Sequence, residues 1–404
     1  MPDQIEWSLT TIGDLADIFD GPHATPKKTD SGPWFLSISS LSNGRLDLSE
    51  SAHVSEEDFA KWIRRVTPKK DDLLFSYETR LGEAALMPDG IRACLGRRMG
   101  VLRPKREIVD PRFLLYAYLG PKFQQLIQER RIHGATVDRI PLREMATWPI
   151  SLPGIQDQRA IAYVLGSLDD KIANNLQISQ ITSELAEARL GLAVRDDPRS
   201  ETIVLSKAAR SLSGGTPNTG EPSYWNGEIP WISASSLTNF FVDSSDRRIT
   251  QLGAANGTRI VDVGTALCVV RGMSLKSEFR IGIATRSVAF GQDCKAFIAR
   301  PDIGQYIFAY ALRSRRTDIL NLVDEAGHGT GRLDSGLLGG IELDLPHVDH
   351  RPKIEAELAL LTEEAVSRQR ENMILTELRN MLLPKLMSGE ILVRDAEKLV
   401  GGAV

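Results

Sequence analysis

Arginine residues recur in matched pairs along this chain. Arg80 and Arg280 each stand two residues before a glycine. Arg139 corresponds to Arg332, and each is followed by an aliphatic residue. A guanidinium can donate two parallel hydrogen bonds to a phosphate group or to the O6 and N7 atoms of guanine. The matched arginines therefore indicate contacts with nucleic acid. Ion pairs on the protein surface are the alternative explanation.

Hydroxyl groups and further cations stand near these arginines. Thr136 precedes Arg139 and Thr330 precedes Arg332, each in a loop that contains glycine. Hydroxyls and cations together bind phosphates and position a protein on a duplex. The other side chains that we consider as DNA contacts are Arg97, Arg98, Arg130, Arg131 and His133 in the first half, and Arg271, Lys276 and Arg286 in the second.

Motifs of several catalytic chemistries are missing from the sequence. It has no Gly-x-x-x-x-Gly-Lys-Ser/Thr loop, no Asn/Asp-Pro-Pro-aromatic run and no Gly-x-Ser-x-Gly turn. The segment 110–113 (Asp-Pro-Arg-Phe) lacks the second proline and is predicted to start a helix. His347 and His350 have no suitably spaced acidic or cysteine partner, and the three cysteines are scattered. We therefore expect neither a catalytic centre nor a metal site.

Charge is unevenly distributed along the chain. The net charge is −4 and the pI is about 6.0, but twelve Lys and Arg residues face only five Asp and Glu residues between Lys61 and Arg106. Binding to phosphates needs a local cationic face and not a basic protein. A solvated surface is the alternative explanation for this segment.

The most informative regularity is an internal duplication with a period of about 193–200 residues. Matched segments occur in the same order: 33–41 with 230–237, 80–84 with 280–284, 103–104 with 300–301, 139–140 with 332–333, and 152–168 with 345–361. Trp34 and Trp231 fall in matched β-like runs, and we expect both to pack in a core. One module is therefore used twice.

Each module has the same predicted plan. About 150 residues of short β-like runs, with one short helix at 111–128 or 303–323, end in a Leu-Pro dipeptide and a long helical stretch. Apolar residues recur there at about 3.5-residue spacing. The positions expected in the helix seam, which is also a candidate partner-docking surface, are Ile161, Leu165, Leu168, Ile172, Leu185, Ile354, Leu358, Leu361, Leu375 and Leu382.

The long helices should bury their apolar stripes against each other. The first, from about residue 155 to 192, would be about 55 Å long, and the second would run until Pro384 stops it. We predict an antiparallel coiled coil between two similar mixed α/β domains, which is an α+β fold with a pseudo-twofold internal repeat. The alternative is that each helix packs only on its own domain.

Several motifs carry a resemblance to a known family. Residues 213–217 (Ser-Gly-Gly-Thr-Pro) and 224–233 resemble the opening of a target-recognition domain in the DNA-specificity subunits of Type I restriction-modification systems. Residues 152–172 are similar to the central helix of that family, and 382–391 to its C-terminal signature. The chain departs from the family at 350–352 (His-Arg-Pro), where Gln-Arg is expected. A proline is tolerated there only in the first turn of a helix.

The resemblance implies a non-catalytic protein that reads a split target in double-stranded DNA. It also implies that the loops of Thr136 with Arg139 and of Thr330 with Arg332 contact the DNA, because the family has a hydroxyl and a cation in a loop before the final strand. The partners of the protein would be two methyltransferase subunits and the restriction (translocase-nuclease) subunits. Those partners, and not this chain, would bind S-adenosylmethionine, ATP and magnesium. The implied domains are target-recognition domains at 1–153 and 196–346, spacer helices at 154–195 and 347–391, and a tail at 392–404.

Two other functions remain open at this point. The chain could be the recognition part of a related DNA methyltransferase or endonuclease, or a coiled-coil scaffold that binds proteins only. No apolar run approaches the roughly 18–20 residues of a membrane span, and the N-terminus carries no export signal. We therefore expect the chain in the cytoplasm, without contact to a membrane.

Overall fold

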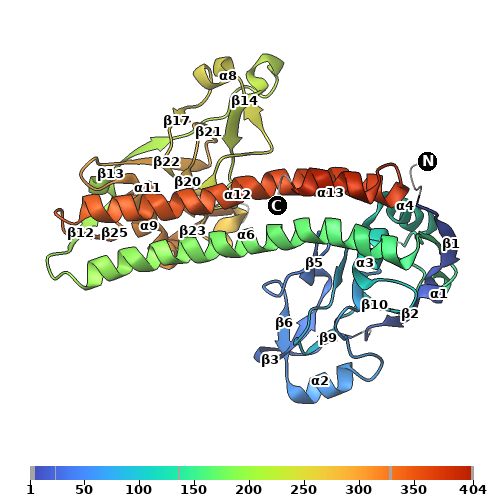
Figure 1. Ribbon diagram of the computed structural model, residues 1–404. Coiled ribbons are helices and arrows are strands. Elements are labelled where there is room, and N and C mark those ends of the chain that lie inside the picture. Colours follow the sequence, from blue (N-terminus) through green and yellow to red (C-terminus); the bar gives the residue numbers. More distant parts are fainter. Residues whose placement is uncertain (1–4, 23, 135–136, 327–329, 402–404) are drawn as a thin grey trace. The chain divides into compact units, whose positions relative to one another are not determined.

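A computed structural model describes residues 5–22, 24–134, 137–326 and 330–401. The chain forms two compact units: residues 1–173 with 372–404 make unit 1, and residues 174–371 make unit 2. Two long helices, α6 (Ile155–Arg195) and α12 (Arg351–Ser388), pack against each other (Figure 1). The predicted mixed α/β fold with two halves and two packed long helices is confirmed.

Unit 1 is built around a four-stranded antiparallel sheet in the order β2-β10-β7-β8. These strands are β2 (Ala16–Asp20), β7 (Leu73–Ser76), β8 (Ala84–Leu86) and β10 (Met99–Pro104). The smaller sheets join β6 (Ala52–Val54), β3 (Lys28–Leu36) and β9 (Ala93–Leu95); β1 (Ser8–Thr11) and β11 (Pro149–Leu152); and β4 (Leu41–Ser42) and β5 (Arg45–Leu46). The short helices are α1 (Ile12–Leu15), α2 (Glu56–Trp62), α3 (Pro111–Leu119), α4 (Pro121–Arg130), α5 (Leu142–Met145) and α13 (Val393–Gly401).

Unit 2 repeats this plan with a five-stranded sheet in the order β13-β22-β18-β20-β15. Its strands are β13 (Ala209–Ser213), β15 (Phe241–Val242), β18 (Ala266–Val269), β20 (Ile281–Ala284) and β22 (Cys294–Ala299). The smaller sheets join β16 (Arg248–Ile249), β14 (Trp225–Ile232), β21 (Val288–Phe290) and β17 (Ile260–Val261); β19 (Arg271–Gly272), β24 (Thr330–Leu333) and β23 (Val323–Ala326); and β12 (Glu201–Val204) and β25 (Glu342–Leu345). The short helices are α7 (Leu205–Ala208), α8 (Gln251–Ala255), α9 (Gln305–Ser314), α10 (Arg316–Leu320) and α11 (Ser335–Gly339).

Both helices that were predicted as single short segments are interrupted. The helix predicted at 111–128 is split into α3 and α4 at Gly120, whose backbone is extended. Pro121 causes this break, because proline disfavours helical backbone in the residue before it. The helix predicted at 303–323 is likewise divided into α9 and α10, and its last residue belongs to β23.

The prediction that Pro384 ends the second long helix is wrong. Pro384 lies inside α12, which continues to Ser388. A proline this close to the end of a helix removes one backbone hydrogen bond. Leu386 and Met387, which follow it, are buried in the core of unit 1. We infer that this burial offsets the lost bond. Pro352, at the other end, sits harmlessly in the first turn as expected.

Both long helices contribute to both cores. In unit 1, Leu165 of α6 and Leu382 of α12 belong to one buried cluster, and both are fully buried. In unit 2, Ala186 of α6 and Leu358 of α12 are equally buried in another cluster. The alternative that each helix packs only on its own domain is therefore wrong.

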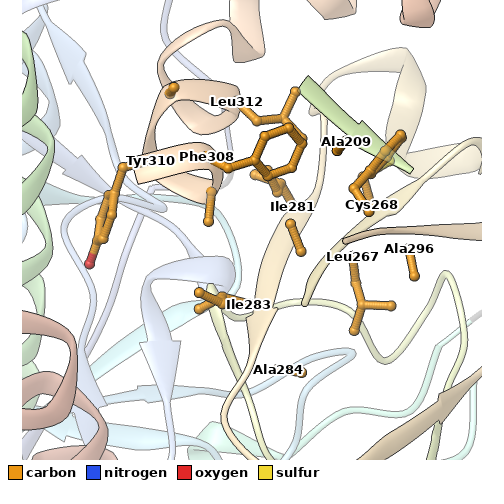
Figure 2. Packing of buried hydrophobic residues seen from close by; sticks show 14 of the residues in the cluster. Ala209, Leu267, Cys268, Ile281, Ile283, Ala284, Ala296, Phe308, Tyr310 and Leu312 are labelled. Atoms are coloured by element: carbon orange, nitrogen blue, oxygen red, sulfur yellow. The ribbon is translucent and has the colours of Figure 1, made fainter. Parts of the chain in front are cut away.

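The core of unit 2 also shows how a short helix covers its main sheet. Phe308 and Leu312 of α9 lie beside Cys268 and Ile281 of the five-stranded sheet (Figure 2). All four residues are buried. The matched β-like runs predicted from the sequence therefore form the inner face of a core.

The two helices run antiparallel within each unit. In unit 2, Asn175 donates to the Glu371 carboxylate at 2.8 Å, and Arg189 lies 2.7 Å from Glu357. Residues with increasing numbers along α6 thus contact residues with decreasing numbers along α12. In unit 1, the Asn372 amide donates to the carbonyl of Ile172. The direction predicted for the pair is confirmed.

Polar anchors at the start of each long helix are repeated in the two units. Gln158 is buried and donates to the carbonyls of Pro153 at 3.0 Å and Ile108 at 3.2 Å. Arg351, which occupies the matched position 193 residues later, is buried and donates to the carbonyl of Pro346 at 3.0 Å. The unexpected arginine in the second helix thus replaces the glutamine in the same structural role.

A second repeated anchor ties the domain to the middle of the helix. The Tyr116 hydroxyl donates to Asp169 at 2.7 Å in unit 1, and Tyr310 lies 3.1 Å from the Thr362 hydroxyl in unit 2. Burial, together with the charge of Asp169, raises the pKa of Tyr116 above its usual range. Tyr116 therefore keeps its proton and remains a donor.

We expect Gln158→Ala to lower the free energy of unfolding of unit 1 by about 2–4 kcal/mol, because it removes three hydrogen bonds to buried backbone groups. The third bond is donated by the backbone N–H of Asp110 at 3.0 Å. Denaturant unfolding of the full chain, followed by circular dichroism, measures the change. The control is Gln156→Ala in the same turn, where the side chain is exposed. Equal unfolding midpoints for the two variants would contradict the anchoring role.

Candidate nucleic-acid interface

The matched arginines Arg80 and Arg280 hold equivalent loops within the protein. Arg80 donates to the carbonyl of Ile38 at 3.1 Å and pairs with Glu83 at 3.4 Å. Arg280 donates to the carbonyl of Ala234 at 3.4 Å and forms an ion pair with a glutamate two residues before it. Both guanidinium groups therefore form hydrogen bonds and ion pairs within the protein, which agrees with the alternative explanation of surface ion pairs.

Arg139 is held at the end of a loop in unit 1 by its backbone. Its N–H donates to the carbonyl of Ile132 at 3.0 Å, and the N–H of Ile132 donates back at 2.9 Å. The side chain of Arg139 is exposed. Nearby, Asp138 pairs with Arg131 at 3.3 Å and with the His133 ring at 3.1 Å. Thr136 lies outside the described residues.

Other predicted cations of unit 1 surround this loop or lie apart from it. Arg98 adopts a positive φ of 76° and forms an ion pair with Glu78 at 3.0 Å. Glu78 is the bridge partner of Arg139, so Arg98 belongs to the same region. Arg97 is exposed in the turn before β10, and Arg130 is exposed at the last position of α4.

Unit 2 brings its predicted cations together on a small sheet. Arg271 of β19 and Arg332 of β24 are direct partners across an antiparallel ladder, so their side chains lie on one face. Asp324 of β23 is the partner of Arg332 on the other side. Thr330 lies on the same strand as Arg332, and Lys276 belongs to a short 3-10 turn that packs on this strand. Like charges placed directly opposite each other are destabilising unless an anion joins them.

One carboxylate beside this sheet is held ionised by its own helix. Asp334 accepts hydrogen bonds from the backbone N–H groups of Leu337 and Gly336 at the start of α11. These donors, and to a smaller extent the charge of Arg332, hold the pKa of Asp334 below its usual range. Arg286 is exposed in the connection between β20 and β21, and it does not belong to the sheet of Arg271.

The positive segment between residues 61 and 106 is largely neutralised in unit 1. Carboxylates lie within ion-pair distance of Lys61, Arg65, Lys70, Arg80, Arg92, Arg98, Arg103 and Arg106. Most of this segment is therefore a solvated surface of ion pairs. Fewer of its cations are free to bind phosphates than the count of charges in the sequence indicates.

The residues predicted for the helix seam divide into two groups. Ile161, Leu165, Leu168, Ile172, Ile354, Leu358, Leu375 and Leu382 are buried, and Leu361 is partly buried. Leu185 is instead 54% exposed. It shares one face of α6 with Ile178, Ile181 and Leu192, which are also exposed. Helix α6 thus has a buried apolar face and an exposed one, and apolar spacing alone did not separate them.

Two further findings bear on other kinds of site. Among the described residues, no group of three His, Cys, Asp or Glu side chains is arranged to hold a metal ion. His347 lies 3.2 Å from Asp349, and His350 lies 3.0 Å from Asp197. In the part of the chain that the structure describes, every helix is too short or too polar for a membrane span.

Comparisons with known proteins agree with this architecture. Residues 4–183 match the family described as Type I restriction modification DNA specificity domain. The specificity subunit of the Type I restriction enzyme EcoR124I/EcoR124II from Escherichia coli is 27% identical over 156 residues, which are 38% of this chain and 39% of that protein. The specificity subunit of the HindI enzyme from Haemophilus influenzae is 20% identical over 80% of this chain and 87% of its own.

A solved structure supports the fold over nearly the full length. The crystal structure of the Type-I restriction-modification system S subunit from M. genitalium has a TM-score of 0.61 with this chain and 18% sequence identity. The likeness covers 96% of this chain and 97% of that one. Together with the family match, it leads to one conclusion: residues 4–183 are a DNA specificity domain of the Type I restriction-modification family, and nearly the whole chain has the fold of an S subunit of such a system.

Proposed function

We propose that this chain reads a bipartite target in duplex DNA, with one half-site bound by each recognition domain. The recognition domains would be residues 1–153 and 196–346, with spacer helices at 154–195 and 347–391 and a tail at 392–404. The observation that carries the proposal is the repetition of exposed arginines at matched places, Arg139 in unit 1 and Arg332 in unit 2. Each comes from a short extended segment that a neighbouring strand or bridge holds in place.

The electrostatics of unit 2 favour an anionic ligand. Arg271 and Arg332 stand directly opposite each other, and Arg332 has one acidic cross-strand neighbour, Asp324. The cost of this like-charge pair disappears when a phosphate or the O6 and N7 atoms of a guanine accept hydrogen bonds from both guanidinium groups. Thr330 and Lys276 add a hydroxyl and a further cation beside them.

The exposed apolar face of α6 supports docking of protein partners. Ile178, Ile181, Leu185 and Leu192 recur at helical spacing on unit 2, and Ile181 is 53% exposed. Contiguous apolar residues on a surface mark a site for another protein. We propose that methyltransferase subunits dock on the long helices and that the restriction subunits join the same complex. S-adenosylmethionine, ATP and magnesium would then be bound by these partners.

The proposal of two half-sites predicts separable effects of two variants. Arg139→Gln and Arg332→Gln should each relax sequence discrimination in a different half of the target, by about 1–3 kcal/mol at an affected base pair. Fluorescence anisotropy of the assembled complex with duplexes that carry single substitutions in either half measures this discrimination. Arg210→Gln, an exposed arginine on β13, is the control. Unchanged discrimination in both variants, or effects confined to the same half, would contradict the proposal.

The docking face predicts a loss of assembly without a loss of folding. Leu185→Asp should abolish co-purification with the methyltransferase, because it places a charge in an apolar interface. Its melting temperature should stay within about 2 °C of the wild type, since surface substitutions rarely change stability by more than about 0.5 kcal/mol. The matched control is Leu252→Asp on α8, where the leucine is 53% exposed. If both variants assemble normally, the face is not a docking site.

A further inference from the structure

An exposed arginine of unit 2, Arg247, is stacked on two tryptophans, of which Trp231 is buried and Trp225 is partly buried. The guanidinium carbon of Arg247 lies 3.8 Å from the ring centroid of Trp225 and 4.9 Å from that of Trp231. The two rings meet edge to face, with centroids 5.6 Å apart. Each indole N–H donates to a backbone carbonyl, of Asn218 at 3.1 Å and of Gly215 at 3.0 Å. The platform under Arg247 is therefore fixed in orientation.

Among the residues that the structure describes, no acidic side chain pairs with the stacked guanidinium. Arg247 is exposed, and no carboxylate of the described residues lies within ion-pair distance of it. Its backbone is also held, because the N–H of Trp231 donates to the carbonyl of Arg247 at 2.9 Å. Arg248 next to it is exposed as well. A guanidinium that is held against aromatic rings by cation–π contacts still has N–H groups that can donate to an acceptor in the solvent.

Unit 1 has a related arrangement at the matched tryptophan. His53 of β6 is the cross-strand partner of Trp34 in β3, as Arg247 is beside Trp231 in unit 2. The His53 and Trp34 rings stack with centroids 4.0 Å apart. The Nδ1 atom of His53 lies 2.7 Å from the carbonyl of Gly32, which fixes the ring in position. Both units thus present a nitrogen-bearing side chain on the matched tryptophan.

We propose that Arg247, positioned by Trp225 and Trp231, binds a phosphate of the DNA backbone at a second contact within unit 2, and that His53 on Trp34 occupies the corresponding place in unit 1. This inference rests on the proposed reading of duplex DNA. The contact is separate from the sheet of Arg271 and Arg332, because Arg247 directly precedes β16, which pairs with β14 in a different sheet. Figure 1 places β14 on the side of unit 2 that is away from α12.

A backbone phosphate fits this place better than a base. Phosphates recur at regular spacing along every duplex, so a cation that is held in one position can meet a phosphate whatever the sequence of the half-site. A preorganised guanidinium also loses little side-chain entropy when it binds, which favours a fixed phosphate contact. Arg247 would therefore position the duplex, while the loops of Arg139 and Arg332 would discriminate bases.

The test measures duplex binding by the full chain in complex with its methyltransferase, by fluorescence anisotropy over a range of salt concentrations. Arg247→Gln should weaken binding by about tenfold near 0.1 M salt, for target and non-target duplexes alike. The slope of log K against log salt should decrease in magnitude by about 0.9, because one phosphate contact is lost. Arg247→Lys should keep that slope and lose part of the affinity, because it retains the charge without the planar guanidinium that contacts the two rings.

A variant that should strengthen the salt dependence of duplex binding provides a second test, because a misfolded protein would not gain a phosphate contact. His53→Arg should increase the magnitude of the salt slope by about 0.9 at pH 8, because it places a permanent cation on Trp34. Arg210→Gln is again the control for an exposed arginine elsewhere in unit 2.

The possible outcomes separate this inference from the proposed function. If the wild-type complex binds its duplex but Arg247→Gln leaves affinity and slope unchanged, the phosphate contact is wrong and the proposed function stands. A loss of discrimination at one base pair with an unchanged slope would assign Arg247 to a base and overturn the phosphate contact. If the wild-type complex shows no salt-dependent duplex binding, the proposed function fails and this inference fails with it.

Discussion

The burial of two long apolar stripes against each other is the constraint on which the structure depends. Helices of 41 and 38 residues cannot bury such stripes alone in water. Each helix buries its stripe in both units. In the core of unit 1, α6 contributes Leu165 and α12 contributes Leu382. In the core of unit 2, α6 contributes Ala186 and α12 contributes Leu358. The sheets of both units are therefore built onto the helix pair and share cores with it.

Polar contacts at matched positions fix where the domains attach. Gln158 and Arg351 anchor the helix starts, and Tyr116 and Tyr310 tie the domains to the helices farther along. Such buried groups are costly unless they are satisfied, so they disfavour any other register of the helices. The same helix α6 keeps a second apolar face in solvent, so one face of the helix packs in the cores and the other stays exposed.

Much of this architecture could be predicted from the sequence, because duplication and helical periodicity are properties of residue order. The long helices and their buried positions followed from apolar spacing. The exposure of Leu185 did not, since spacing gives the face of a residue but not what covers it. The site was less predictable. Arg80 and Arg332 look alike in sequence, yet Arg80 pairs with Glu83 and Arg332 stands opposite Arg271. The position of Arg247 depends on two tryptophans and on the register between β14 and β16, which no local motif signals.

The most direct test of the account is a map of adenine methylation in cells that carry this chain with its neighbouring methyltransferase gene, compared with cells that lack the chain. The account predicts a two-part methylated motif that disappears without the chain. It also predicts that exchange of residues 1–150 for those of another specificity subunit changes only one part of the motif. An active methyltransferase whose motif persists without the chain, or an exchange that alters both parts, would contradict the claim that each domain reads its own half of the target.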